Sequence, residues 1–238
     1  MKIALIGYGK MGKVIETIAL ERKHEIVLEV DSHNKDNFSL DDLKKADVAI
    51  EFTNPGGVVG NILKCFEANV PVVVGTTGWN KRIDELSKIC KERNQTMFYA
   101  SNFSIGVNIF FRLNDYLSKI MNNFPEYDVF VQEIHHIHKL DSPSGTAITL
   151  ANNIVKNIDR KDKWVNFDSD EENELSIISD REDEVAGTHI VNYYSEVDDI
   201  ELTHVANNRK GFAIGAVTAA EWVIGKKGVF GMEDMLKF

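Results

Sequence analysis

Residues 1–12, MKIALIGYGKMG, contain the stretch that decides the fold. An apolar run at residues 3–6 leads into a G-x-G-x-x-G turn, and apolar residues at helical spacing follow. In this pattern the first glycine permits a tight turn, the second lets a pyrophosphate approach the backbone, and the third lets the helix pack against the strand. The start of the helix then attracts phosphate. The candidate cofactor-binding residues of this turn are Gly7, Tyr8, Gly9, Lys10, Met11 and Gly12.

The same alternation of apolar runs and helical spacing continues through the first hundred residues. Near-continuous apolar strands that alternate with helices indicate a parallel sheet covered by helices on both faces, a Rossmann-type α/β fold. The predicted strands are residues 3–6, 26–30, 48–52, 70–74 and 97–100. The predicted helices between them are residues 11–19, 58–66 and 83–90.

Asp31 ends the second predicted strand, nineteen residues after Gly12. A carboxylate at this place can accept hydrogen bonds from the adenosine ribose of a dinucleotide. A 2′-phosphate would be repelled there, and the next residue is Ser32 rather than arginine, although His33 and Lys35 could partly compensate. We therefore expect NADH to be favoured, with NADPH as an alternative.

Two further loops follow later strands of the predicted parallel sheet. In such sheets, ligands bind outside the carboxyl ends of the strands, where small hydroxylated residues can reach the nicotinamide half of the cofactor. Ordinary turn chemistry is the alternative for either loop alone, but both fall at one sheet edge. The candidate cofactor contacts are Gly75, Thr76 and Thr77 in one loop and Ala100, Ser101, Asn102 and Phe103 in the other.

Composition narrows the class of protein. The 238 residues carry a net charge of −10, which argues against nucleic acid or an anionic membrane as the main partner. No apolar run approaches the roughly 20 residues needed to span a bilayer. Cys65 and Cys90 are the only cysteines, and both lie in segments with helical spacing, as buried thiols in a reducing compartment would. We expect a cytoplasmic protein.

The pattern changes after residue 102. A long apolar-periodic helix at residues 105–121 is followed by strands that arrive without helices between most of them. Such a succession predicts a second, α+β domain with an antiparallel or mixed sheet. A small-residue helix at 212–224 could pack in either domain. The strands predicted for the second domain are residues 127–134, 175–180, 188–195 and 200–205.

Residues 133–147, EIHHIHKLDSPSGTA, concentrate histidines, a lysine and a proline-broken run of small residues. Because strand residues alternate between faces, adjacent histidines can serve one site only where the strand ends. Pro143 suits the first position of a helix, and Ser142 suits its N-cap. Ser144, Gly145 and Thr146 would then offer the N–H groups and hydroxyls of the first turn to an anion.

Three interpretations of the histidines compete. In the first, His135, His136 and Lys139 form a cationic, proton-donating half-site for a small dianionic dicarboxylate. In the second, His135, His136 and His138 bind a metal, but the sequence has no partner motif that would complete such a site. In the third, the histidines are structural. We favour the first, expect no metal, and expect His138 to lie outside the chemistry.

The run at 133–147, with its H-H-x-x-K and S-P-S-G-T-A elements, resembles the signature of the dihydrodipicolinate reductase family, the 4-hydroxy-tetrahydrodipicolinate reductases of diaminopimelate and lysine synthesis. The resemblance spans nearly the whole chain. Further segments that resemble the family, in order, are residues 7–12, 52–55, 75–77, 100–106, 204–209 and 212–216.

The resemblance implies nicotinamide-dependent reduction of a cyclic conjugated imine dicarboxylate to tetrahydrodipicolinate. It implies that His135 is the acid/base and Lys139 the proton donor, and that His136, Gly145 and Thr146 hold the substrate carboxylates beside Ser144. It further implies a discontinuous dinucleotide domain of residues 1–103 and 211–238. Residues 104–210 would bind substrate and join a homotetramer through their sheet.

Two departures from the family pattern stand out. Asp183 occupies a hairpin position that often holds glycine, and the stretch after Asp31 is short. The alternative enzyme is another two-domain nicotinamide oxidoreductase acting on a small amino or imino acid, such as an amino-acid or semialdehyde dehydrogenase. The non-enzymatic alternative is a dinucleotide sensor, which would bind NADH without turnover.

Overall fold

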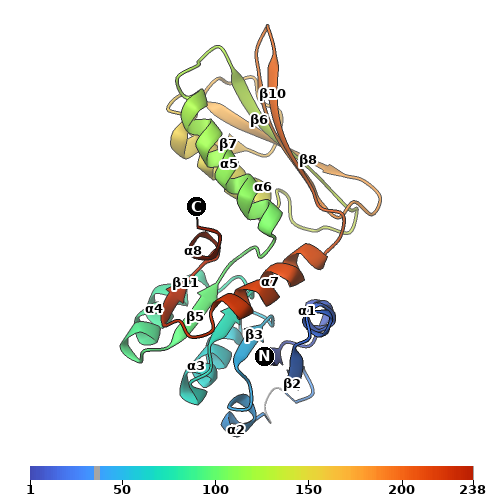
Figure 1. The fold of residues 1–238 in the computed structure, drawn as a ribbon. Coiled ribbons are helices and arrows are strands. Elements are labelled where there is room, and N and C mark those ends of the chain that lie inside the picture. Colours follow the sequence, from blue (N-terminus) through green and yellow to red (C-terminus); the bar gives the residue numbers. More distant parts are fainter. Residues whose placement is uncertain (35–37, 238) are drawn as a thin grey trace. The chain divides into compact units, whose positions relative to one another are not determined.

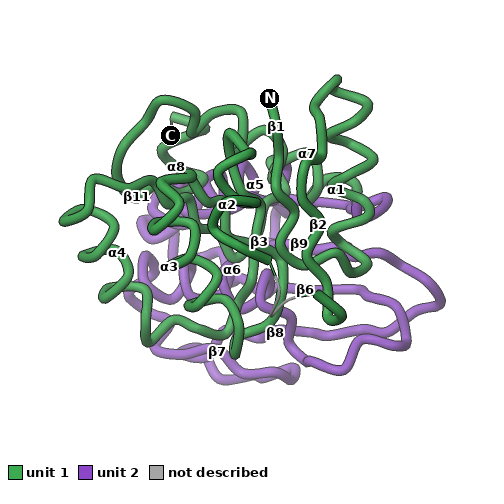
Figure 2. The backbone as a smooth tube through the Cα atoms, turned by 90° about the horizontal axis from the view of Figure 1, so that it is seen from below, with its two compact units in different colours: residues 1–105, 210–238 green, residues 106–209 purple. Residues whose placement is uncertain are grey.

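The computed structural model describes residues 1–34 and 38–237 (Figure 1). The chain divides into two compact units, shown in different colours in Figure 2. Unit 1 consists of Met1–Ile105 and Lys210–Phe238, and unit 2 consists of Gly106–Arg209.

Unit 1 is built on a parallel sheet with the strand order β11-β5-β4-β3-β1-β2 in the described part of the chain. The inner strands β1, β3, β4 and β5 are buried along most of their length, which explains why they appear in the sequence as continuous apolar runs, whereas the edge strand β2 is only partly buried. They are β1 (Lys2–Ile6), β2 (Glu25–Val30), β3 (Val48–Glu51), β4 (Val72–Val74), β5 (Thr96–Tyr99) and β11 (Gly228–Phe230).

Helices cover both faces of this sheet, as predicted. Ile3 and Leu5 of β1 pack in one core with α1, α7 and α8, while Ala4 and Ile6 pack in a second core with α2, α3 and α4. The bounds are α1 (Lys10–Glu21), α2 (Leu40–Leu43), α3 (Val58–Ala68), a 3-10 turn (Asn80–Arg82), α4 (Ile83–Glu92), α7 (Lys210–Trp222) and α8 (Met232–Leu236).

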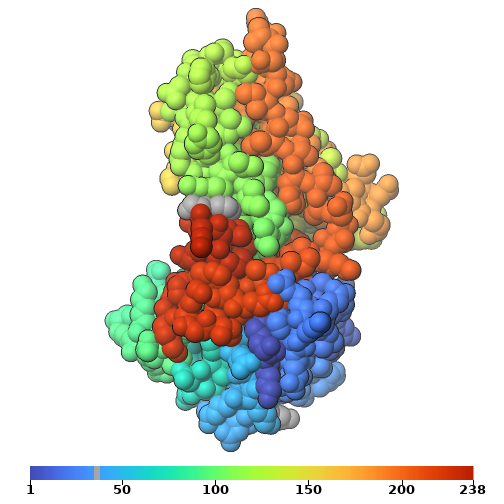
Figure 3. Space-filling model, viewed as in Figure 1, coloured from blue at the N-terminus to red at the C-terminus, as the bar shows by residue number. Residues whose placement is uncertain are grey.

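The C-terminal segment is an integral part of unit 1. Arg22, the C-cap residue of α1, forms a bidentate pair with Glu221 of α7, and the side chain of His24 lies 2.7 Å from the same carboxylate. In the space-filling view, red C-terminal residues lie against blue N-terminal residues (Figure 3). The helix predicted at 212–224 therefore packs against the first helix of the chain.

Unit 2 is built on a mixed sheet with the strand order β10-β9-β6-β8-β7, again for the described residues. The central strand β6 is parallel to β8 and antiparallel to β9, so the prediction of a mixed sheet is confirmed. The strands are β6 (Asp128–His135), β7 (Lys163–Val165), β8 (Glu174–Arg181), β9 (Thr188–Tyr194) and β10 (Asp199–Val205).

Two helices, α5 (Ile105–Met121) and α6 (Gly145–Asn157), cover one face of this sheet. The start of α6 differs from the prediction, because Ser144 rather than Ser142 is the N-cap. Its hydroxyl accepts a hydrogen bond from Ala147 N–H at 3.2 Å, a contact typically worth about 1 kcal/mol. Pro143 therefore precedes the cap and is not the first helical residue.

The hairpin between β8 and β9 accommodates its unusual residue. Asp183 has φ +36°, in the left-handed region that glycine tolerates best and aspartate tolerates better than most residues.

None of the described helices is long and apolar enough to cross a membrane.

Candidate active site

The glycine-rich turn of unit 1 has the geometry that a dinucleotide requires. Gly7 has φ +106°, and a Cβ there would lie 2.1 Å from the carbonyl oxygen of Phe52. A Cβ on Gly12 would lie 2.4 Å from the carbonyl oxygen of Gly7, so this glycine allows α1 to approach the strand. A Cβ on Gly9, by contrast, would meet no described atom within 4 Å. The turn is therefore closed where the protein packs and open where a phosphate would approach.

The start of α1 is suited to an anion. Gly9 is its N-cap and makes no side-chain capping hydrogen bond, and the first turn contains no acidic residue. The first-turn N–H groups of a helix have no partner within the helix and carry partial positive charge. Lys10 and Met11 are the first two residues of the helix. The Tyr8 hydroxyl donates a hydrogen bond to Glu16 at 2.6 Å, and this bond raises the pKa of Tyr8 to about 12. These residues fit a dinucleotide pyrophosphate.

Asp31 directly follows β2. Its Oδ1 accepts hydrogen bonds from the N–H groups of His33 and Asn34 at 2.7 and 3.2 Å, which fixes the carboxylate at the start of the loop. Ser32 is exposed beside it. Lys35, the residue that could compensate a 2′-phosphate, lies outside the described residues.

The two other predicted loops follow β4 and β5 at the same edge of the parallel sheet. Gly75 packs against the ring of Phe52, where a Cβ would come within 2.2 Å, and Thr76 Oγ1 accepts a hydrogen bond from Thr53 N–H at 2.7 Å. Thr77 and Ser101 are exposed, and Ala100 is buried. The Phe103 side chain is part of the core, with its ring 5.6 Å from that of Phe52.

Sequence reasoning missed the residues that join these loops. Glu51, at the end of β3, is fully buried and accepts hydrogen bonds from Thr53 Oγ1 and from Asn61 Nδ2. Burial raises the pKa of Glu51. The polar run that follows β3 was the available signal, because it occupies the same sheet edge as Thr76.

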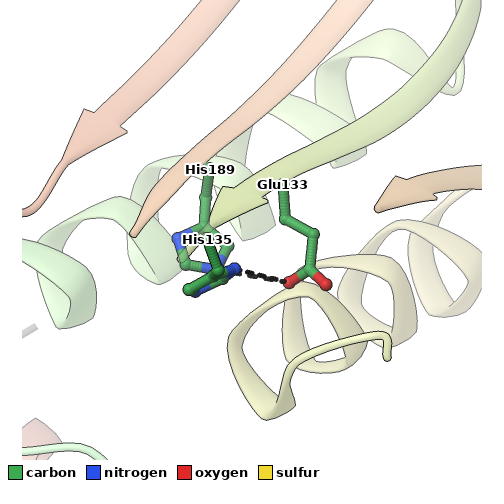
Figure 4. Close-up of side chains that lie close together, drawn as sticks. All are labelled: Glu133, His135 and His189. Carbon is green, nitrogen blue, oxygen red and sulfur yellow. Dashed lines mark ion pairs between the residues drawn. The ribbon is translucent and has the colours of Figure 1, made fainter. Parts of the chain in front are cut away.

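In unit 2, His135 is the last residue of β6 and is 7% exposed. Figure 4 shows it beside Glu133, which lies two residues earlier on the same face of the strand, and His189 of β9. His135 Nδ1 lies 3.6 Å from Glu133 Oε2, and the two imidazole rings meet edge to face with centroids 5.0 Å apart. The end of the strand thus places His135 in a buried polar cluster with Glu133 and His189.

The start of α6 is hydrogen-bonded to this polar cluster. Ser144 N–H donates to both carboxylate oxygens of Glu133 at 3.0 and 3.1 Å, and Ser144 Oγ lies 3.1 Å from His189 Nε2. Ala147 N–H is satisfied by the cap, so the first-turn N–H groups that remain without a partner inside the helix are those of Gly145, which is exposed, and Thr146, which is half-buried. Gly145 is exposed, and a Cβ there would meet no described atom within 4 Å.

The loop between β6 and α6 holds the remaining predicted residues. Lys139 Nζ contacts both carboxylate oxygens of Asp141 at 2.8 Å, and Lys139 N–H donates to the His136 carbonyl oxygen. His136 is half-buried. His138 is exposed and pairs with Glu184 at 3.3 Å. The loop therefore joins His135 to the helix start and carries Lys139, whose charge helps to lower the pKa of His135.

Sequence reasoning also missed His189 and Gly187. Gly187 has φ +149°, and a Cβ there would lie 3.0 Å from His135 Nε2, so this glycine leaves room for the imidazole. Alternation along β9 placed His189 on one face of a strand but did not identify its neighbours.

Burial sets the charge state of the two imidazoles. It lowers the pKa of His189 to about 3, an effect that positive charge on His135, His204 and Lys139 reinforces. Burial also lowers the pKa of His135, opposed by Glu133 and reinforced by Lys139. His189 is thus neutral at neutral pH.

The metal hypothesis for His135, His136 and His138 is not supported by the described residues. The group that could hold an ion is instead Glu133, His135 and His189, whose ligand atoms lie within 4.8 Å of one another. Both carboxylate oxygens of Glu133 already accept hydrogen bonds from Ser144, and one also accepts from Ser179 Oγ at 2.9 Å. The geometry is that of a hydrogen-bonded network.

Comparisons with known proteins agree with this arrangement. The family profile "Dihydrodipicolinate reductase, N-terminus" matches residues 1–103, and "Dihydrodipicolinate reductase, C-terminus" matches residues 106–236. A relative from Christiangramia forsetii named 4-hydroxy-tetrahydrodipicolinate reductase is 48% identical over 99% of this chain and 98% of its own. A relative of the same name from Archaeoglobus fulgidus is 34% identical over the full length of both.

Solved structures agree on the fold. A dipicolinate-bound dihydrodipicolinate reductase from Paenisporosarcina sp. TG-14 matches 98% of both chains with a TM-score of 0.79 at 24% identity. An aspartate semialdehyde dehydrogenase from Vibrio cholerae matches 94% of this chain with a TM-score of only 0.52 at 12% identity. Together, the two profiles and the full-length relatives show that this chain belongs to the dihydrodipicolinate reductase family.

Proposed function

We propose that this protein is an NAD(P)H-dependent 4-hydroxy-tetrahydrodipicolinate reductase of the diaminopimelate and lysine pathway. The observation that carries the proposal is the junction of β6 and α6, where a buried imidazole and an exposed helix start are held together by one carboxylate. That junction suits a small ring that carries two carboxylates and accepts a proton. The full-length relatives carry the name of the same reaction.

The residues of unit 2 would divide the work of binding the substrate. The N–H groups of Gly145 and Thr146 would hold one carboxylate, with His136 and the Thr146 hydroxyl beside it and Ser144 maintaining the helix cap. The bound dianion would favour the charged form of His135, whose pKa burial lowers in the free protein. Substrate binding would therefore favour the protonated form of His135, which is the form that can act as an acid.

The bound nicotinamide nucleotide supplies a hydride to the conjugated imine, and the chain supplies the matching proton. Negative charge that develops on the substrate would be stabilised by the helix start and by nearby cations. His135 would donate or relay the proton, and Lys139 would supply one after release from Asp141. After water has left the 4-hydroxy substrate, hydride and proton together give the tetrahydrodipicolinate product.

We propose unit 1 as the dinucleotide-binding domain, with the residues of the glycine turn, Asp31, Ser32 and the loops after β4 and β5 as its contacts. The open Gly9 and the uncapped start of α1 support this assignment. Asp31, with no arginine beside it, favours NADH, with NADPH as an alternative.

Replacing Asp31 by alanine should weaken NADH binding more than NADPH binding. The carboxylate accepts hydrogen bonds from the ribose hydroxyls and repels a 2′-phosphate, so its loss removes a favourable contact for one cofactor and an unfavourable one for the other. Dissociation constants for both cofactors, measured by fluorescence titration, provide the check. Equal weakening of both would argue against the ribose role.

We also propose that unit 2 forms a homotetramer through the face of its sheet opposite α5 and α6, and that the enzyme is cytoplasmic. Val205 of edge strand β10 and Tyr194 of β9 support the assembly, because they lie on that face of the sheet and are 56% and 42% exposed. Sedimentation of the purified chain would measure the assembly.

The function is tested by NADH and NADPH oxidation with the freshly generated product of the preceding synthase, in the presence and absence of a chelator. We expect turnover that chelation leaves unchanged. Cofactor binding without turnover would favour the sensor, and activity lost on chelation would favour a metal at Glu133, His135 and His189.

A further inference from the structure

We propose that the buried carboxylate of Glu133 is a positioning residue, which fixes the anion-binding start of α6 against the end of β6 and places a negative charge beside His135. This inference rests on the proposed function for its catalytic consequence. Its structural part depends only on contacts within unit 2.

Glu133 connects three elements of unit 2. It is 0% exposed at the centre of the sheet and accepts Ser144 N–H from the start of α6 with both oxygens. It also accepts the Ser179 hydroxyl from β8, its partner in the strand register. Burying a carboxylate costs free energy unless it is paired and hydrogen-bonded. The hydrogen bonds that satisfy Glu133 also join the start of α6 to β6 and β8.

Charged groups of both signs surround His135. Arg181 of β8 lies 3.7 Å from Glu133, and Lys139 of the following loop is paired with Asp141. Neutral His189 faces His135 from β9. Burial, Lys139 and Arg181 lower the pKa of His135, while Glu133 and Asp141 raise it.

A substitution at residue 133 can separate the positioning effect of the Glu133 side chain from the effect of its charge. Glutamine at 133 would keep an oxygen that accepts Ser144 N–H, so the helix start would stay in place, but it would carry no charge. Glu133 Oε2 is 3.6 Å from His135 Nδ1, and an opposite charge at that distance stabilises the imidazolium. Glu133→Gln should therefore make His135 harder to protonate.

The experiment is an NMR titration of imidazole-labelled protein, with His135 assigned by the loss of its signal in His135→Asn. In Glu133→Gln the His135 midpoint should fall by about one pH unit or more. Ser179→Ala, which removes a hydrogen bond to Glu133 but keeps its charge, is the matched control and should leave the midpoint near that of the wild type.

Arg181→Met provides a second test that leaves residue 133 itself unchanged and removes the cation 3.7 Å from its carboxylate. Removing this opposing cation should raise the His135 midpoint, so the inference can be judged even if Glu133→Gln does not fold. An unchanged midpoint in either folded variant would overturn the inference.

Kinetics would then measure the consequence. An acid is active in its protonated form, so activity should fall as pH rises, and this alkaline limb should move to lower pH in Glu133→Gln. Wild-type turnover tests the proposed function separately. Suppose that the wild type turns over normally, but that Glu133→Gln changes neither the alkaline limb of the pH profile nor the His135 midpoint. That result would contradict the role of Glu133 and leave the proposed function standing.

Discussion

Replacing His135 by alanine should lower kcat by about 10²- to 10⁴-fold, the range typical for removal of a general acid. The imidazole is the last side chain of β6, is nearly buried, and has Glu133 on one side and Gly187 on the other. A water molecule entering the space would be a poor replacement, because it is a much weaker acid than an imidazolium and would not be held in a fixed position.

The matched control is His138→Ala. His138 is three residues away but exposed and paired with Glu184, so its loss should change kcat by less than about twofold. Steady-state kinetics and the dissociation constant of NADH should be measured for both variants. An unchanged kcat in His135→Ala would remove this residue from the mechanism.

Replacing Gly145 by glutamate should raise the KM for the dicarboxylate about a hundredfold or more, without loss of stability. Two like charges about 5 Å apart, at an effective dielectric constant near 20, repel by about 3 kcal/mol. The fold should tolerate the change, because a Cβ at Gly145 meets no described atom within 4 Å and acidic residues stabilise the start of a helix.

Gly145→Gln has nearly the same shape and no charge, so it separates repulsion from crowding. We expect its KM to lie much nearer that of the wild type, and the thermal midpoint of Gly145→Glu to equal or exceed that of Gly145→Gln. If both variants raised KM equally, the start of α6 would not be the carboxylate site.

Most of the fold could be predicted because the inner strands of unit 1 are buried on both faces and most of the long helices have one apolar face. The short elements could not. β11 is only Gly228–Phe230, and β7 lies in a polar segment at Lys163–Val165, so neither produces a recognisable pattern of its own. Each is specified by its partner strand, β5 or β8.

The candidate site divides in the same way. His135, Lys139 and Gly145 could be found because they are close in sequence and stand where a strand gives way to a helix. Their supports could not, because Glu133 acts through residues 11 and 46 positions away, and His189 comes from another strand. The N-cap was wrong by two residues because only the contacts of Ser144 with Glu133 and His189 fix where α6 begins.

The most direct test of the central claim is a crystal structure of this protein with dipicolinate, a stable planar dicarboxylate. One carboxylate should lie within about 3 Å of the N–H groups of Gly145 and Thr146, with the ring beside His135. A dicarboxylate bound elsewhere, with the start of α6 making no contact to it, would contradict the account.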